Sequence, residues 1–236
     1  MKYINFIPRN SLAESLVPPP KPAKSFIPEW YKKIPSMHND SVSKPRPSTV
    51  KRCMPFLDSF TTGYIQELWC DLYFEVTEDK LNNTFSIVYN WAENIKPISS
   101  RAEDHNNSEL LPKSSQFWPT EFQWETQWEP ELPSGYSALY IHPLNRYDLP
   151  FLTLSGIVDT DKYPVPGPLP FFLKSDFTGM IPAGTPMYQI IPIKREDWQS
   201  NKSKYNEEKN KKLSFNVKKY FYNGYKNVIW EKKDYK

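Results

Sequence analysis

The stretch that decides the fold is LSGIVDTDKYPVPGPLPFFLKSDFTGMIPAGTPMYQIIPI, residues 154–193. It opens with an apolar strand pattern that ends at two acids, Asp159 and Asp161. It closes with a Gly-Thr-Pro turn at 184–186, which leads into the apolar run Met187–Ile193. Short apolar runs between turn residues are typical of strands. We therefore expect strands within 151–158, 171–174 and 187–193.

The composition of the whole chain also favours short strands. Of its 236 residues, 24 are proline, which is excluded from helix interiors and central strands. Its 14 Phe, 15 Tyr and 8 Trp offer large surfaces for a core. A chain of this length suits one domain with elaborations. We expect a mainly β protein, with a body at 49–194, an N-terminal arm at 1–48 and a helical segment at 195–236.

The arm begins with a strand pattern, Met1–Pro8, which we place at a sheet edge because proline cannot donate to a ladder. Proline then punctuates the chain from Ser11 to Ser48, with one or two helical turns expected at Ile27–Ile34. The aromatic residues of this arm either pack onto the body or dock into a partner's aromatic groove.

The body is predicted to consist of strands, turns and loops in succession. The elements expected are a short strand at Val50–Met54, turns at Asp58–Gly63, a strand over Gly63–Val76, a hairpin turn at Asp79–Asn83, a return strand at Thr84–Trp91, an exposed loop at Ala92–Lys113 that holds His105, a strand at Tyr136–His142 and a loop at Pro143–Pro150.

The clearest single strand is Phe122–Glu129, FQWETQWE. Alternation places one set of side chains on one face, Phe122, Trp124, Thr126 and Trp128, and the polar set on the other, Gln123, Glu125, Gln127 and Glu129. Such a row of rings packs in a core, stacks on bases or sugars, or forms a protein interface. The first of these alternatives is the usual one.

The C-terminal segment differs in charge from the rest of the chain. Lys194–Lys236 contains 13 Lys/Arg against 6 Asp/Glu, a net charge of +7, which leaves −4 for the remainder of a chain whose net charge is +3. We expect a solvated helix over Trp198–Tyr222, with Asp197 as its N-cap and a break at Asn223–Gly224. Its interleaved lysines and rings suit docking on the body, nucleic-acid binding or a protein partner.

The central stretch resembles the trimeric dUTPases and related enzymes of the β-clip fold. The residues that carry the resemblance are Gly156-Ile157-Val158-Asp159-Thr160-Asp161, followed by Gly184 and Gln189. It implies a β-clip-like or compact barrel or sandwich body. It also implies that Asp159 corresponds to the acid that orients or deprotonates an attacking water.

The resemblance is limited to about 40 residues and lacks the phosphate-binding parts of that family. His142–Arg146 stands where an Arg-Ser-Ser type motif is expected, and a Lys/Asn-rich segment replaces the glycine-rich C-terminal loop. A chain with 7 glycines has little material for backbone phosphate cradles. The implied fold and the implied activity are therefore separate questions.

A second resemblance covers nearly the whole chain. The segments PPPKPAKSFIPEWYKKIP, KRCMPFLDSFTTGYIQELW, HPLNRYDLPFLTLSGIVDTD and IPAGTPMYQIIPIKREDW are similar to an uncharacterised family of marine tailed phages, especially cyanophages. This resemblance implies a viral origin. With two cysteines, no signal peptide pattern and no apolar run of membrane length, we expect the host cytoplasm or the virion as location.

One cluster of polar residues follows the ends of predicted strands. Its members are the ligand-binding candidates His142, Asn145, Arg146, Asp148, Asp159 and Asp161. They suit a ligand site, a catalytic site based on Asp159, or a structural network in which Arg146 pairs with one of the three acids. We expect no metal site, because no His or Cys pair has zinc-ligand spacing.

From these patterns we expect a phage accessory or structural protein that binds rather than catalyses. The partner expected is a phage or host protein or a second copy of the chain, with nucleic acid as an alternative at the basic segment and no membrane. The alternative function is a nucleotide-binding or nucleotide-hydrolysing β-clip enzyme that uses Asp159 and Arg146. No cofactor is expected except Mg²⁺ under that alternative.

Overall fold

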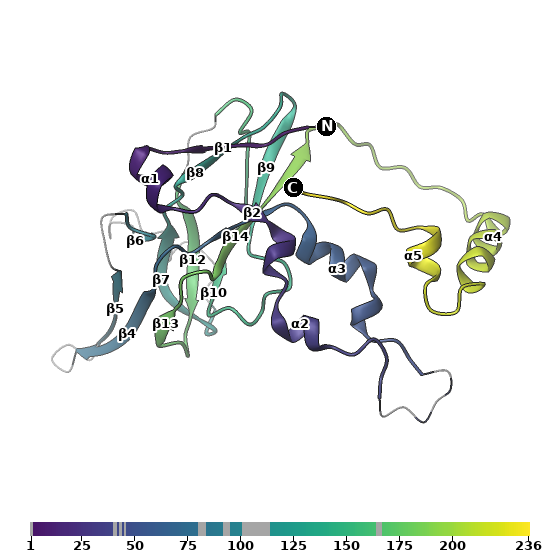
Figure 1. Ribbon diagram of the computed structural model, residues 1–236, viewed down its shortest axis with the longest axis horizontal. Coiled ribbons are helices and arrows are strands. Elements are labelled where there is room, and N and C mark those ends of the chain that lie inside the picture. Colours follow the sequence, from purple (N-terminus) through teal and green to yellow (C-terminus); the bar gives the residue numbers. More distant parts are fainter. Residues whose placement is uncertain are drawn as a thin grey trace. The chain divides into compact units, whose positions relative to one another are not determined.

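The computed structural model describes residues 2–39, 42, 44, 46–79, 84–91, 95–100, 114–163 and 167–236 (Figure 1). This part of the chain is mainly β, with helices at the C-terminus, as the composition predicts. The strands are β1 (Asn5–Pro8), β2 (Lys21–Pro22), β3 (Tyr64–Glu67), β4 (Leu72–Asp79), β5 (Thr84–Trp91), β6 (Ile98–Ser100), β7 (Phe117–Trp124), β8 (Trp128–Glu131), β9 (Tyr136–Ile141), β10 (Phe151–Thr153), β11 (Gly156–Val158), β12 (Leu169–Lys174), β13 (Gly179–Ile181) and β14 (Pro186–Lys194). The helices are α1 (Ser11–Leu16), α2 (Glu29–Lys33), α3 (Met54–Thr61), α4 (Glu207–Lys218) and α5 (Gly224–Val228), with 3₁₀ turns η1 (Ala23–Phe26) and η2 (Val50–Arg52).

The chain divides into two compact units. The β unit consists of Met1–Lys21 and Gly63–Arg195, and the helical unit consists of Pro22–Thr62 and Glu196–Lys236. Each unit therefore combines segments that are distant in the sequence.

The strands of the β unit form antiparallel ladders in four sheets. Their orders are β11-β9-β14-β3-β2, β10-β12-β7-β6, β13-β4-β5 and β1-β8. The central strand β14, which pairs with β9 and β3, is buried from Pro186 to Ile190. Since successive side chains point to opposite faces, both faces are covered there, which explains its largely apolar run. The core lies between the sheets, and Trp124 stacks on Phe171 with ring centroids 3.8 Å apart.

The predicted strand Phe122–Glu129 is two strands. β7 ends at Trp124, and β8 begins at Trp128 in a different sheet, paired with β1. Between them the backbone bonds to other segments, since Glu125 donates its N–H to Pro97 and Gln127 accepts one from Arg9. Phe122, Trp124 and Trp128 are all buried, so the core interpretation is confirmed and the stacking platform is wrong.

The N-terminal arm contains a helix that the prolines concealed. The predicted edge strand is confirmed as β1, which ends at Pro8 opposite Trp128. Asn10 then caps α1, because its Oδ1 accepts the Ala13 N–H at 2.8 Å. The indole Nε1 of Trp128 donates to the Val17 carbonyl at 3.0 Å, which ties this part of the arm to the β unit.

The prediction of a strand at Val50–Met54 and turns at Asp58–Gly63 is wrong. Thr49 accepts the Lys51 N–H and starts η2, and α3 follows with a proline in its first turn. The rings of Phe56 and Phe60 recur at helical spacing and pack on Tyr31 of α2. Tertiary packing of these rings stabilises α3, where the local pattern alone suggested turns. The turn predicted at Ile27–Ile34 is confirmed as α2.

The remaining β predictions are confirmed with shifted bounds. Gly63–Val76 divides into β3 and β4, and β4 pairs with the return strand β5 in a hairpin. The predicted loop Ala92–Lys113 contains a strand, β6, which pairs with β7. The hairpin turn at 80–83 and the loop residues 101–113, with His105, lie outside the described residues.

The C-terminal helix begins later than predicted. Residues 195–206 are not helical, and Asn206, rather than Asp197, caps α4 by accepting the Lys209 N–H at 2.9 Å. Two acids, Glu207 and Glu208, follow Asn206 in the first turn, where their negative charges interact favourably with the helix dipole. The expected solvated character is confirmed, since α4 has no buried residue. Among the described residues, no helix has both the length and the apolar character needed to cross a membrane.

Candidate functional site

The six predicted site residues do not form one cluster. β11 pairs antiparallel with β9, so that Val158 lies opposite Ala138 and Gly156 lies opposite Tyr140. The end of β11, where Asp159 follows, therefore lies at the start of β9, whereas His142 follows the end of β9. The carboxyl ends of neighbouring strands lie together only when the strands are parallel. β9 and β11 are antiparallel, so the carboxyl end of each lies beside the amino end of the other. The structure yields two groups at opposite ends of one ladder.

The first group is a carboxylate pair held by an arginine. Arg195 Nη1 donates to Asp161 Oδ1 at 2.8 Å, and Arg195 Nη2 donates to Asp161 Oδ2. The backbone N–H of Gly135 also donates to Asp161 Oδ2, at 2.8 Å. The hydrogen bond from Arg195, followed by that from Gly135, lowers the pKa of Asp161 to about 2. Asp161 is thus an ionised anchor, and its side chain is only 4% exposed.

Asp159 lies beside this anchor and is open to solvent. Ser137 Oγ donates to Asp159 Oδ1 at 2.6 Å, and Arg195 Nη1 lies 3.2 Å from the same oxygen. The hydrogen bond from Ser137 and the charge of Arg195 lower the pKa of Asp159. Its side chain is 50% exposed. A carboxylate with a lowered pKa is a weak general base, although it is well placed to accept a hydrogen bond from a ligand.

Arg195 is the residue that the sequence interpretation missed. It directly follows β14, whose Lys194 pairs with Tyr136, and its own N–H donates to the Gly135 carbonyl at 2.9 Å. The ladder of β14 and β9 therefore brings Arg195 to the start of β9. Arg195 and Asp161 lie on opposite sides of the domain boundary predicted at 194/195. Their proximity follows from the register of β14 on β9, which the sequence pattern does not reveal.

The second group lies in the loop 142–150. Arg146 forms a bidentate pair with Asp148, with Nε 2.9 Å from Oδ1 and Nη2 2.9 Å from Oδ2. Asn145 adopts a left-handed conformation, φ 59°, in the tight turn before Arg146. Of the partners considered for Arg146, the structure selects Asp148 and excludes Asp159 and Asp161, which bind Arg195.

His142 is a structural, neutral histidine in this loop. Its Nδ1 accepts the Thr153 N–H at 3.3 Å, so its proton is on Nε2, which donates to the Arg146 carbonyl at 3.0 Å. Burial lowers the pKa of His142. The buried Gln189 accepts the Leu144 N–H through Oε1 at 2.9 Å, which fixes the start of the loop to β14.

A pocket adjoins the first group, at Asp161. It has a volume of about 510 Å³, and its lining residues are Lys2, Tyr3, Asn5, Glu131, Leu132, Pro133 and Asp161. The lining is largely polar, and Asp161 contributes a carboxylate that Arg195 already binds. Within the described part of the chain, no group of three or more His, Cys, Asp and Glu side chains could hold a metal ion.

The basic C-terminal segment is the other candidate surface. Of its rings, Trp230 is held by a hydrogen bond to Asp58 within the helical unit, whereas Tyr220, Phe221, Tyr222 and Tyr225 remain exposed. Docking on neighbouring residues therefore explains Trp230, and Tyr222 contacts the Arg52 guanidinium, whereas Phe221 is 72% exposed.

Comparison of the chain with models of protein families and with curated proteins finds no match. The class that fold and site define is a mainly β protein with a structural arginine–carboxylate network and a basic, aromatic C-terminal segment.

Proposed function

We propose that this chain is an accessory or structural protein of a tailed phage and that it acts by binding rather than by catalysis. The observation that supports this most directly is the mutual pairing of the charged candidates. Arg195 donates hydrogen bonds to the carboxylate of Asp161, and Arg146 forms a bidentate ion pair with Asp148. Such pairs stabilise loops and leave these groups poorly suited to activate a substrate.

The strand topology supports the same proposal. A β-clip nucleotidase that used Asp159 and Arg146 would need both groups at one ligand. They lie in the two groups at opposite ends of the β9–β11 ladder, which spans residues 138–140 on β9. The lowered pKa of Asp159 further weakens it as a proton acceptor at neutral pH.

The alternative is a nucleotide-binding or nucleotide-hydrolysing enzyme centred on Asp159. The observation in its favour is that this carboxylate is half-exposed, ionised and oriented by Ser137. Mg²⁺ would be its cofactor, bound together with the substrate phosphates.

A thermal-shift screen discriminates between the two functions. Deoxynucleoside triphosphates and cyclic nucleotides, each with and without Mg²⁺, are expected to leave the melting temperature unchanged. Stabilisation that disappears in Asp159→Ala but persists in Asp176→Ala, an exposed acid on the turn after β12, would show nucleotide binding at Asp159. Release of phosphate or pyrophosphate from the bound nucleotide would then be needed to establish the enzyme alternative. Mass spectrometry of purified virions tests the structural role separately. Copies of the chain in the particle would support it.

A further inference from the structure

The segment between Glu208 and Glu231 combines positive charge with aromatic rings. It contains six lysines and six aromatic residues and no acidic residue. Its lysines are Lys209, Lys211, Lys212, Lys218, Lys219 and Lys226. The segment forms α4, a turn at 219–223 and α5, which we call the C-terminal hairpin.

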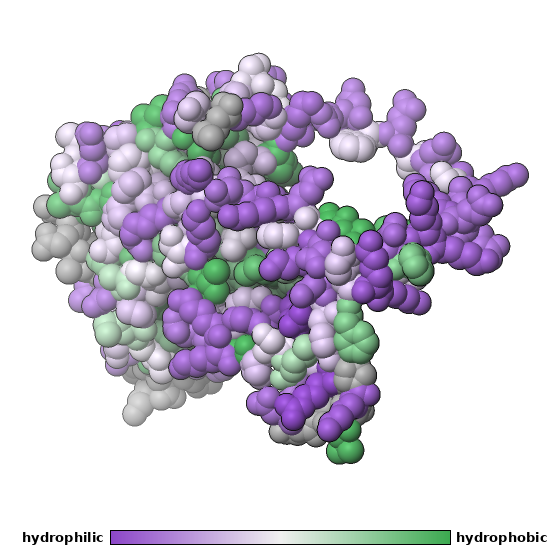
Figure 2. Space-filling model, turned by 45° about the vertical axis from the view of Figure 1, so that its right-hand side comes forward, coloured by the Kyte–Doolittle hydropathy of each residue, from purple (hydrophilic) through white to green (hydrophobic). Residues whose placement is uncertain are grey.

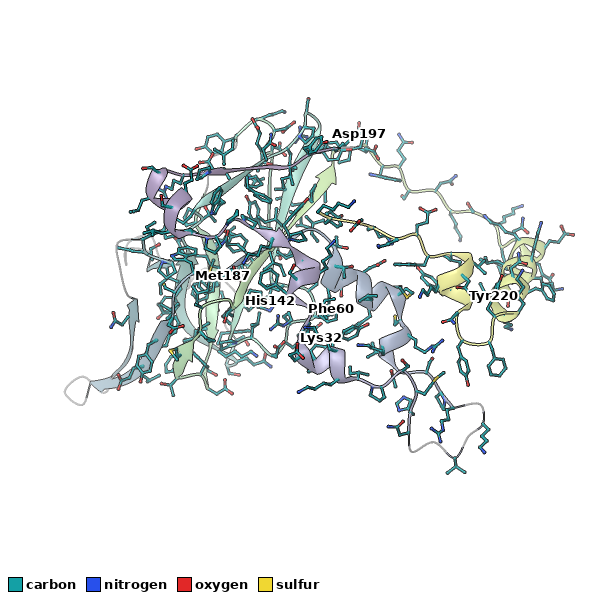
Figure 3. All side chains as sticks on the ribbon, viewed as in Figure 1. Lys32, Phe60, His142, Met187, Asp197 and Tyr220 are labelled. Carbon is teal, nitrogen blue, oxygen red and sulfur yellow. The ribbon has the colours of Figure 1, made fainter. Side chains whose placement is uncertain are left out.

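The two helices of the hairpin approach closely at one point. Gly224 is buried at the start of α5, and a Cβ there would lie 2.2 Å from the Val217 carbonyl oxygen of α4. The two helices are therefore in close contact on either side of the turn at 219–223. Figure 3 places Tyr220 within this turn.

The rings at this turn are left partly or largely uncovered by the fold. Phe221 is 72% exposed, and Tyr220, Tyr222 and Tyr225 are also exposed. The rings of Phe221 and Tyr222 lie edge to face with centroids 5.0 Å apart. Several exposed rings that gather at one place mark an interaction site, whereas single exposed apolar residues are ordinary.

Basic groups surround these rings. Lys219 Nζ lies 5.2 Å from the Tyr220 ring, and the Arg52 guanidinium lies 5.2 Å from the Tyr222 ring. Arg52 also donates to Asn223 Oδ1 at 2.7 Å, which fixes the turn to η2 within the helical unit. Hydrophilic residues dominate the surface over α4 in Figure 2. A partner therefore needs both negative charge and flat faces that stack on rings.

The tail after the hairpin is tied down within the same unit. Trp230 Nε1 lies 3.0 Å from each carboxylate oxygen of Asp58 on α3, and Lys233 Nζ lies 2.7 Å from Oδ2. Lys24 pairs with Asp234 at 3.1 Å. The hairpin is consequently held at its end, with its ring-bearing turn uncovered.

Other partners fit these residues less well. A second copy of the hairpin would bring lysines against lysines. A membrane surface selects a helix with one apolar face, whereas Leu213, Phe215 and Val217 of α4 are spaced by two and place Phe215 opposite the other two. Single-stranded nucleic acid supplies both the phosphates and the base faces.

We infer that the turn of the C-terminal hairpin binds single-stranded nucleic acid. Phe221 and Tyr222 stack on bases, and Lys218, Lys219 and Lys226 neutralise phosphates. This inference rests on the proposed function, because it specifies what a binding protein of this kind would bind.

Fluorescence anisotropy of the full chain with labelled 20-mers of oligo-dT and oligo-rU tests the inference. Binding is expected to weaken with salt, with a slope of log K against log [salt] of about −2 to −4 for three to six phosphate contacts on single strands. Phe221→Ala should weaken binding about 5- to 150-fold, since stacking on one ring contributes about 1–3 kcal/mol. The comparison of the two oligomers shows whether DNA or RNA is preferred.

Matched variants separate this site from general charge. Lys218→Gln with Lys219→Gln should reduce the magnitude of the salt slope by about 0.7 for each phosphate that the variant no longer neutralises. Lys33→Gln with Lys162→Gln removes the same charge from exposed positions elsewhere and should keep the wild-type slope. Tyr147→Ala, at an exposed ring of the β unit, is the control for Phe221→Ala.

Three outcomes would overturn the inference. The first is no binding of either oligomer at 50 mM salt by protein with the expected circular dichroism of a folded chain. The second is equal binding of a duplex with no effect of Phe221→Ala, which indicates unspecific attraction to polyanions. The third is tighter binding to vesicles that contain 30% phosphatidylserine than to either oligomer. In each case, presence of the chain in virions would leave the proposed function standing.

Discussion

The β unit and the helical unit differ in how far their aromatic residues are buried. In the β unit, Trp124 and Phe171 stack on each other and are completely enclosed by the sheets. In the helical unit, Phe60 and Tyr31 form a small packed cluster, whereas Phe215 and Phe221 are each 72% exposed. Aromatic residues in this chain therefore have two roles, one in the core and one at the surface. Rings on strands build the core, and rings among lysines remain available to a partner.

The largest effect is expected from Trp124→Ala. This change removes the stack on Phe171 and the hydrogen bond from Nε1 to Thr153 Oγ1, 3.0 Å long, from the centre of the β unit. Large-to-small changes of buried aromatic residues cost about 3–5 kcal/mol of unfolding free energy. Urea denaturation followed by circular dichroism measures the loss. A loss below about 1 kcal/mol would show that Trp124 is not a core residue.

A smaller loss is expected from Gly63→Ala at the start of β3. Gly63 has φ 72°, and a Cβ there would lie 2.2 Å from the Ile190 carbonyl oxygen of β14. The left-handed conformation alone costs a residue with a side chain about 1–2 kcal/mol, and the close approach to Ile190 adds to this cost. Gly135→Ala has a similar φ with open space around it, so it should cost less than Gly63→Ala in the same denaturation experiment.

The attachment of the C-terminal tail is tested by Trp230→Phe. The change keeps a ring but removes the Nε1–H that donates to Asp58. Loss of one hydrogen bond to a charged group is expected to cost about 1.5 kcal/mol of helical-unit stability. Trp198→Phe is the control, because Trp198 is 85% exposed. Equal melting curves for the two variants at 222 nm would contradict the attachment.

The carboxylate network predicts a pH dependence of stability. The folded pKa of Asp161 is about 2, below the value of about 3.9 in an unfolded chain. The folded state therefore binds fewer protons, and the contribution of Asp161 is complete above pH 4 and lost as pH falls towards 2.

Asp161→Asn should flatten the melting temperature between pH 4 and pH 2 relative to wild type. Asp176→Asn, an exposed acid outside the network, should keep the wild-type slope. Identical slopes for wild type and Asp161→Asn would mean that Arg195 does not hold this carboxylate.

The sequence predicted the β unit better than the helical unit, for a physical reason. Strands such as β9 and β14 are marked by apolar runs and turn residues, which are local signals. Helix α3 is packed through contacts between Phe60 and the distant Tyr31, which no local pattern contains, so Asp58–Gly63 was predicted as turns. The start of α4 could not be predicted, because Asp197 and Asn206 are equally suitable N-cap residues by type. The structure shows that Asn206 is the cap.

The candidate site was predicted by residue type and not by arrangement. Asp159 and Asp161 stand out in the sequence because two acids directly follow a strand. Their partner Arg195 is brought to them by the register of β14 on β9, which no local pattern contains. The same register sends His142 and Arg146 to the other end of the ladder. Antiparallel pairing thus decides which polar residues meet.

The smallest effect on stability, and the sharpest test of the comparison between the two units, is expected from Phe221→Ala. An exposed ring on a turn contributes within about 0.5 kcal/mol to unfolding. The same change is expected to weaken binding of oligo-dT or oligo-rU about tenfold. Parallel urea denaturation and anisotropy titrations measure both quantities on one preparation. If Phe221→Ala instead destabilises the helical unit by as much as Trp230→Phe, then its ring serves the fold, and the contrast between a buried and a presented set of rings would not hold.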